Sequence, residues 1–211
     1  MPRQQNEQPY DTRKAVRVIR NSDPDMATLI ERVGPCRLRV RSSLTPFHAL
    51  LRSVIYQQLS GKAAATIYSR TLNLFSYRRP TPGKVLRAGE NQLRCAGLSR
   101  AKTASILDLA EKTLDGTIPS SAKLRHMRDD DVINALVQVR GIGQWTVQML
   151  LIFHLGRADV LPGADLGVRK GLQLTSRLQQ LPTPEQVLRR GERWRPYRSV
   201  ASWYLWRAND L

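Results

Sequence analysis

The chain has 211 residues, enough for one or two domains, and its 41% of hydrophobic residues exclude a disordered chain. Lysine and arginine number 34 against 17 aspartates and glutamates, which gives a net charge of +17. This excess favours a polyanionic partner, nucleic acid above all, over the alternative of a merely basic surface.

Membrane insertion, secretion and a cysteine-based site are all disfavoured. No stretch reaches the ~18 apolar residues of a membrane span, and the first twenty residues lack the apolar run of a signal peptide. Cys36 and Cys95 are too few for a disulfide framework or a four-thiolate metal site. His48, His126 and His154 have no ligand spacing. We therefore expect a reduced cytoplasmic setting, nucleoid-associated if the source is bacterial, and no membrane.

Helix signals dominate the chain. We expect the polar and basic residues 1–22 to form a loose tail. Asp23-Pro24 and Thr45-Pro46 each place a capping side chain and a first-turn proline before a helix. Further helices are predicted after Ser99, from near Arg128 to Val137, over 143–156, after Thr183-Pro184 and over 196–210.

Two of these helices carry stronger boundary signals. The helix after Ser99 is expected to end at Gly116, and Gln186 follows Thr183 at the spacing of a capping box. Alternation typical of a strand is weak and confined to residues 36–42. The pattern therefore predicts an all-α fold of roughly ten short helices with short connections.

Two glycines stand at the start of a predicted helix, in "VQVRGIGQWTVQMLLIFHLG" (137–156). A helix N-terminus exposes unpaired N–H groups and the positive end of its dipole. Gly141 and Gly143 would let a phosphate approach this backbone closely, although an ordinary tight turn between helices is the alternative. In a chain of charge +17, we favour the phosphate cradle.

A set of five separated segments carries a family resemblance. The segments, in the order of the chain, are "VIYQQLSGKAAATI" (54–67), "AGLSRAKTASILDLA" (96–110), "LVQVRGIGQWTVQMLL", "DVLPGADLGVRKGL" and "ERWRPYRSVASWYLWR" (192–207). Together they resemble the helix–hairpin–helix DNA glycosylase superfamily, in its AlkA-like DNA-3-methyladenine glycosylase II branch, over roughly residues 45–207. We expect no counterpart of the N-terminal β-domain that some members have, since too few residues precede Thr45.

The resemblance implies a fold and an activity. The fold would be a two-lobed helical bundle over 23–211, with lobes of roughly 45–156 and 23–44 plus 157–211 and the active site in the cleft between them. The activity would be that of a monomeric enzyme on double-stranded DNA. It would flip out alkylated bases of the 3-methyladenine and 7-methylguanine type and hydrolyse the N-glycosidic bond, which starts base excision repair.

Asp165 lies where the superfamily has its catalytic aspartate, between "PGA" and "LGVRK". Cleavage builds oxocarbenium character on the sugar, and a carboxylate beside C1′ would stabilise that charge and orient water. The alternative is a helix cap, and Asp165 is also expected to cap the helix that follows it. Many relatives have Asp-Asp here, whereas this chain has Ala164 before Asp165.

Trp145 and Trp206 match the tryptophans that line the base pocket in this branch, with Tyr56 and Met149 completing its walls. Related lyases carry at the position of Trp145 a lysine that forms a Schiff base, which tryptophan cannot do. The resemblance therefore implies a monofunctional glycosylase. A cationic alkylated base would be attracted to the tryptophan faces by about 0.5–2 kcal/mol. The alternative for both tryptophans is a place in the core.

Gln58 and Leu59 lie where the family inserts a wedge into the gap left by the flipped nucleotide, and the sequence does not choose between them. No cofactor is expected beyond a structural Na⁺ or K⁺. The resemblance assigns that cation to the backbone carbonyls of Val137, Val139 and Ile142, and assigns phosphate contacts to Gly141, Gly143, Thr146 and Arg140, the last of which replaces the usual hairpin proline.

Other functional classes stay open at this point. Hairpins of this kind also occur as non-catalytic grips on the DNA backbone. A glycosylase could act instead on oxidised guanine, uracil or mismatched adenine, although the chain lacks a cysteine cluster and a lysine at position 145. The further alternative of an RNA-binding or membrane-surface protein is supported by the positive charge alone. The sequence does not rank the alkylated bases.

Overall fold

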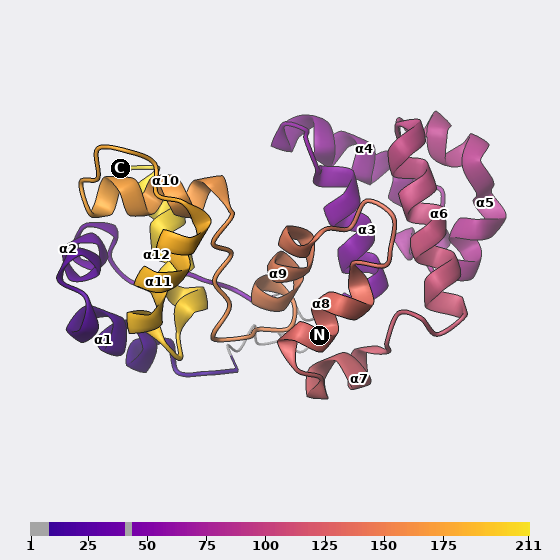
Figure 1. Cartoon of the computed structure of the whole chain (residues 1–211). Coiled ribbons are helices and arrows are strands. Elements are labelled where there is room, and N and C mark those ends of the chain that lie inside the picture. The colour runs from indigo at the N-terminus through magenta and orange to yellow at the C-terminus, as the bar shows by residue number, and fades with distance from the viewer. Residues whose placement is uncertain (1–8, 41–43) are drawn as a thin grey trace. The chain divides into compact units, whose positions relative to one another are not determined.

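A computed structural model describes residues 9–40 and 44–211, and these residues form helices and connecting segments (Figure 1). The expected all-α class is confirmed for them, with twelve α-helices where roughly ten were expected. The structure assigns no strand to residues 36–40, so the strand expected there is wrong, and residues 41–42 lie outside the described part. The helices are α1 (Thr12–Ser22), α2 (Pro24–Val33), α3 (Pro46–Tyr56), α4 (Gly61–Asn73), α5 (Pro82–Cys95), α6 (Arg100–Leu114), α7 (Ser121–His126), α8 (Asp129–Leu136), α9 (Gln144–Phe153), α10 (Leu166–Thr175), α11 (Pro184–Gly191) and α12 (Arg198–Ala208), with 3₁₀ turns η1 (Ser76–Arg78) and η2 (Glu192–Trp194).

The helices belong to two compact units. The terminal unit consists of Met1–Ser42 and Leu151–Leu211, and the central unit of Ser43–Leu150. These boundaries lie a few residues before those expected for the two lobes. Helix α9 begins in the central unit, and its last turn belongs to the terminal unit.

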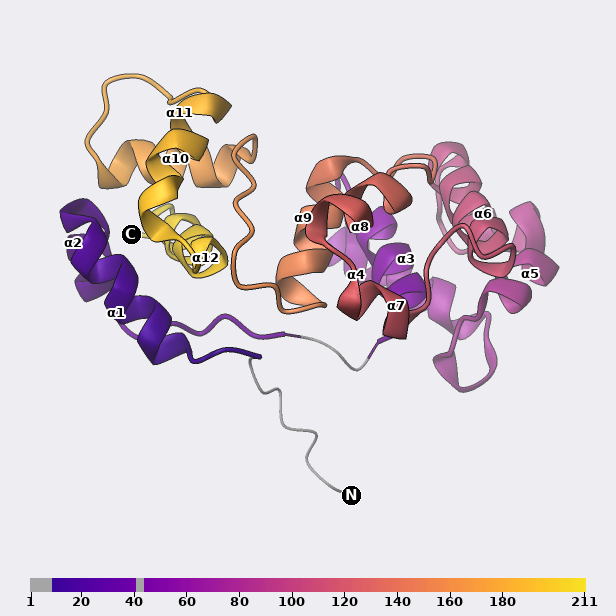
Figure 2. The same cartoon turned by 60° about the horizontal axis from the view of Figure 1, so that its bottom comes forward.

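The terminal unit packs α12 against α10, α2 and α1 (Figures 1 and 2). At its centre Asp23 is fully buried and caps α2. Arg190 donates to its carboxylate at 2.8 and 2.7 Å, and the indole N–H of Trp194 donates at 3.0 Å. A buried carboxylate needs such partners, so this cluster ties the start of α2 to α11 and η2.

Helix α1 corrects the expected loose tail over residues 1–22, of which 1–8 lie outside the described part. The Asp11 carboxylate caps the helix by accepting from the N–H of Arg13 at 2.8 Å. Ala15 and Ile19, four residues apart, are fully buried, and α1 packs against α2, η2 and α12. Charged residues cover the other faces of α1, which is why its composition resembles that of a tail.

The central unit packs α6 against α5 and α3, and α3 against α4. Thr45, Ser60 and Ser99 cap α3, α4 and α6 with hydroxyl oxygens that accept backbone N–H groups. The sequence predicted the helix starts at Thr45 and Ser99. The fully buried side chains of this unit include Leu50, Leu51, Val54, Ile55, Val85, Leu93, Ile106, Leu109, Leu124 and Leu136.

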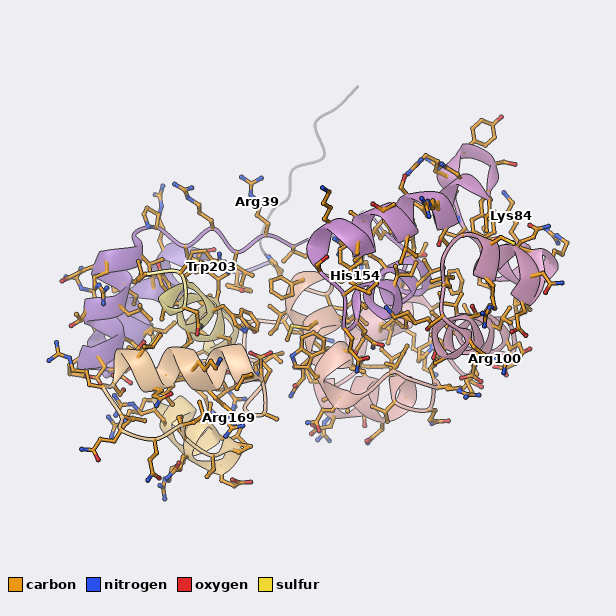
Figure 3. All side chains as sticks on the ribbon, turned by 90° about the horizontal axis from the view of Figure 1, so that it is seen from above. Arg39, Lys84, Arg100, His154, Arg169 and Trp203 are labelled. Atoms are coloured by element: carbon orange, nitrogen blue, oxygen red, sulfur yellow. The ribbon has the colours of Figure 1, made fainter. Side chains whose placement is uncertain are left out.

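Basic side chains lie on the surface of both units. Arg39 points away from the extended segment of the terminal unit, and exposed Arg100 begins α6 in the central unit (Figure 3). In the described part of the chain, no helix combines the length and the apolar composition that crossing a bilayer requires.

Candidate active site

The structure gives different reasons for a glycine at each of the two hairpin positions, 141 and 143. Gly141 has φ +74°, and a Cβ there would lie 2.6 Å from the Ser105 hydroxyl of α6, so the turn itself requires glycine. Gly143 has ordinary backbone geometry, and nothing lies within 4 Å of the position its Cβ would take. Its carbonyl accepts the N–H of Val147 and so starts α9. Open space at a helix N-terminus is what an approaching anion needs.

Hydrogen bonds join the hairpin between α8 and α9 to α6. The Asp108 carboxylate accepts the backbone N–H of Arg140 at 2.7 Å and the Lys112 ammonium at 2.9 Å. Lys112 also donates to the carbonyl of Gln138 at 2.6 Å. Burial raises the pKa of Asp108, but the Arg140 N–H and Lys112 outweigh it and hold this pKa below its ordinary value. The turn is thus held by a charged pair that sequence reasoning missed.

The residues that we expected to contact phosphate differ in how exposed their side chains are. The side chain of Arg140 is exposed, whereas Thr146 is 2% exposed and its hydroxyl accepts from Gln57 at 3.3 Å, which leaves its backbone N–H as the group to consider. Backbone carbonyls are ligands that hard cations accept. Those of Val137, Val139 and Ile142 lie in this turn, and the one of Val139 accepts the N–H of Ile142 at 3.0 Å.

A cavity of about 430 Å³ opens beside the hairpin in the central unit. It brings together three of the expected pocket residues, Tyr56, Trp145 and Met149, and Gln58 also lines it. Sequence reasoning missed Arg52, whose guanidinium carbon lies 4.2 Å from the centre of the Tyr56 ring. The full lining is Arg52, Ser53, Tyr56, Gln57, Gln58, Trp145, Thr146 and Met149. Trp145 is 47% exposed, so it is not a core residue.

The wedge candidates lie in the loop between α3 and α4. Gln58 has φ +54°, a left-handed conformation that residues other than glycine rarely adopt, and its side chain is exposed. Leu59 is 39% exposed, which removes the alternative of a buried helix residue. Both side chains are therefore at the surface.

The Asp165 carboxylate caps a helix and also accepts a hydrogen bond from a tryptophan. Its Oδ1 accepts the N–H of Val168 at 2.8 Å, which caps α10 as expected, and the indole N–H of Trp206 at 2.8 Å. Two donors on one oxygen fix the rotamer of the carboxylate. Ala164, directly before Asp165, is exposed.

Trp206 is half-buried and stacks on Phe153, with ring centres 5.6 Å apart and an angle of 28° between the rings. It thus lies beside Asp165 in the terminal unit, while Trp145 lies in the central unit. Gly167 allows this contact, because a Cβ there would lie 2.9 Å from Trp206 Cδ1 and 3.1 Å from Asp165 Oδ1. Sequence reasoning missed Gly167, whose only signal is its place two residues after Asp165.

Comparisons with known proteins identify the family of this chain. The family model of the HhH-GPD superfamily of base excision DNA repair proteins matches residues 51–196. DNA-3-methyladenine glycosylase 1 of Schizosaccharomyces pombe is 37% identical over 90% of this chain and 84% of its own.

Two solved structures share the fold. One is the S. pombe 3-methyladenine DNA glycosylase Mag1 in complex with abasic DNA, with a TM-score of 0.84, 36% identity and coverage of 94% of this chain and 97% of that one. The other is a DNA-3-methyladenine glycosidase from Bacillus halodurans, with a TM-score of 0.83, 33% identity and coverage of 92% and 88%. The chain belongs to the HhH-GPD superfamily of base excision DNA repair proteins.

Proposed function

We propose that this chain is a monofunctional DNA glycosylase that releases alkylated bases from double-stranded DNA. The observation that carries the proposal is Asp165, whose carboxylate is fixed by the indole N–H of Trp206 and the first turn of α10. The names of the relatives at 33–37% identity support the choice of alkylated bases.

Asp165 would act on the sugar. The bond between C1′ and the base nitrogen breaks, and its electron pair leaves with the base, which is neutralised if it was cationic. The sugar becomes oxocarbenium-like, and the adjacent carboxylate stabilises this charge. A water oxygen then bonds to C1′, and its proton passes to the carboxylate or to solvent. The products are a free base and an abasic site.

The hairpin would hold the DNA backbone. Gly143 offers open space for a phosphate oxygen at the N-terminus of α9, and Arg140 adds an exposed positive charge. A monovalent cation on the carbonyls of Val137, Val139 and Ile142 would add positive charge at the same place. These contacts carry no sequence information, which suits an enzyme that must search all DNA.

The cavity beside the hairpin would receive the flipped base. Trp145, Tyr56 and Met149 supply flat or flexible apolar walls. The Tyr56 ring already faces the Arg52 cation, so we assign the cation–π contact of an alkylated base to Trp145. Gln58 or Leu59 would fill the space that the base leaves.

The experiment that tests the proposal is a panel of duplexes, each with one modified base, incubated with excess protein and analysed for free base. The panel contains 3-methyladenine, 7-methylguanine, hypoxanthine, ethenoadenine and 1-methyladenine. We expect release of at least one alkylated base. Binding without release from any duplex would support the non-catalytic hairpin module instead.

The absence of lyase chemistry is tested on the same duplexes. Because Trp145 has no amine to form a Schiff base, we expect strand breaks only after alkali treatment and no covalent adduct after borohydride. Breaks before alkali together with a trapped adduct would contradict the monofunctional assignment.

A further inference from the structure

The loop that carries the wedge candidates, residues 57–60, has an unfavourable backbone. It joins the end of α3 at Tyr56 to Ser60, which caps α4. Gln58 adopts the left-handed region at φ +54°, which costs free energy for a residue with a Cβ. Contacts from outside the loop must therefore hold this shape.

Lys102 supplies such contacts from the first turn of α6. Its Nζ donates to the carbonyl of Ile55 at 2.8 Å and to the carbonyl of Gln57 at 2.7 Å. Carbonyls in the last turn of a helix have no partner within the helix, and a positive charge there is favoured by the helix dipole. The ammonium thus bridges the end of α3 and the residue directly before Gln58.

The side chain of Gln57 ties the same loop to the hairpin. Its Nε2 donates to the carbonyl of Gly141 at 3.0 Å and to the Thr146 hydroxyl at 3.3 Å. The carbonyl of Gln57 is bound to Lys102 and its amide to the hairpin, so both ends of this residue are fixed. The loop and the hairpin therefore form one connected structure within the central unit.

One face of α6 supports both parts. Lys102, Ser105, Asp108 and Lys112 are spaced by three, three and four residues, which places them along one side of the helix. Lys102 holds the loop, Asp108 and Lys112 bind the hairpin, and Ser105 occupies the space that a Cβ at position 141 would need. Figure 1 shows α6 in the central unit, where it packs on α3.

We propose that Lys102 is a positioning residue that holds the wedge loop at a fixed place relative to the hairpin. This inference rests on the proposed function. A wedge that is already ordered loses less conformational freedom when it enters the base stack. The advantage should therefore be largest where the base pair is hardest to open, and smallest where the damaged base has no partner.

The test uses Lys102→Met, which removes the donors but keeps a good helix former of similar length, and Lys102→Arg, which keeps them. Lys123→Met, at an exposed position of α7, is the control for the removal of a charge. Single-turnover release of 7-methylguanine is measured from duplexes in which the lesion faces cytosine or an abasic-site analogue, and thermal unfolding is recorded for each variant.

We expect Lys102→Met to lower the rate opposite cytosine by about tenfold, equivalent to ~1.4 kcal/mol, and to have a much smaller effect opposite the abasic analogue. Lys102→Arg and Lys123→Met should stay near the wild-type rate on both duplexes. An equal loss on both duplexes, as general destabilisation would produce, or no loss on either would overturn the inference.

Failure of the proposed function would look different, because the wild type would then release no base from any duplex. Lys102 can still be tested by binding alone, with 2-aminopurine placed next to an abasic-site analogue as a fluorescent reporter of unstacking. At equal occupancy, a smaller fluorescence rise with Lys102→Met than with Lys123→Met supports the inference, and an equal rise refutes it.

Discussion

Replacing Asp165 by Asn separates its structural hydrogen bonds from the negative charge that we propose for catalysis. The Asn side chain keeps a carbonyl oxygen that can accept from the N–H of Val168 and the indole of Trp206, so both 2.8 Å hydrogen bonds have an acceptor. Asn is as good a helix cap as Asp. The stability of α10 should therefore fall by about 1 kcal/mol at most, because the negative charge at the positive end of the helix dipole is removed.

The loss in catalysis should be far larger. A carboxylate ~4 Å from a positive charge gains about 4 kcal/mol at an effective dielectric constant of ~20. The amide of Asn supplies almost none of this to the oxocarbenium. A difference of about 4 kcal/mol in the barrier corresponds to about a thousandfold in rate. Asp165→Asn should thus fold like the wild type and release almost no base.

Single-turnover base release and thermal unfolding measure the two quantities. Asp210→Asn, which removes an exposed carboxylate near the end of the same unit, serves as the matched control and should keep the wild-type rate. Binding to an abasic-site analogue should be nearly unchanged for both variants. If Asp165→Asn retains more than about a tenth of the wild-type rate, a barrier difference below ~1.4 kcal/mol, Asp165 is a cap only.

Three further predictions concern Trp206, Gly143 and Arg190. Trp206→Phe keeps a ring for stacking but removes the donor to Asp165, so single-turnover release should fall by about tenfold or more, since such a hydrogen bond contributes about 1.5–3 kcal/mol. Gly143→Val should weaken binding to damaged and undamaged duplexes alike and lower the log–log salt slope by about 0.9 for each phosphate that the hairpin no longer neutralises. Arg190→Met should destabilise the fold by about 3–5 kcal/mol in thermal unfolding, because it leaves the buried Asp23 carboxylate without its cation.

Each of these predictions has its own control. Trp206→Phe must keep its affinity for an abasic-site analogue, or the effect is not on catalysis. Gly143→Val should leave thermal unfolding nearly unchanged, whereas Gly141→Ala should lower the unfolding temperature, since a Cβ there meets Ser105. Arg189→Met, at the exposed neighbouring position, should be within about 0.5 kcal/mol of the wild type, and an equal loss in both arginine variants would contradict the role of the Asp23 pair.

The sequence predicted best what depends on local chemistry. Asp23-Pro24, Thr45-Pro46 and Thr183-Pro184 located the starts of α2, α3 and α11, because a cap and a first-turn proline act within four residues. Helix α1 was missed because its composition is mostly polar and charged, and its two buried residues gain stability only by packing on distant elements, namely α2, η2 and α12. Its signal was the cap at Asp11 with apolar residues four apart.

The candidate site was predicted less completely, because its contacts join distant parts of the chain. Trp206 and Asp165 are 41 residues apart, and Lys102 and Gln57 are 45 apart, so no local pattern could pair them. Arg52 had a readable signal, since it lies one helical turn before Tyr56 on α3. The motif positions were therefore available from the sequence, and their partners were not.

Capping α10 and the proposed role in catalysis do not exclude each other at Asp165. A capping side chain is held in one orientation by a backbone N–H at the N-terminus of a helix. A group that stabilises a positive charge on a sugar also needs a fixed orientation. Capping α10 thus prepares Asp165 for its proposed role, and Trp206 adds the donor that an ordinary cap does not have. Gly167 is needed for this hydrogen bond, because any side chain there would push the Trp206 indole away from the Asp165 carboxylate.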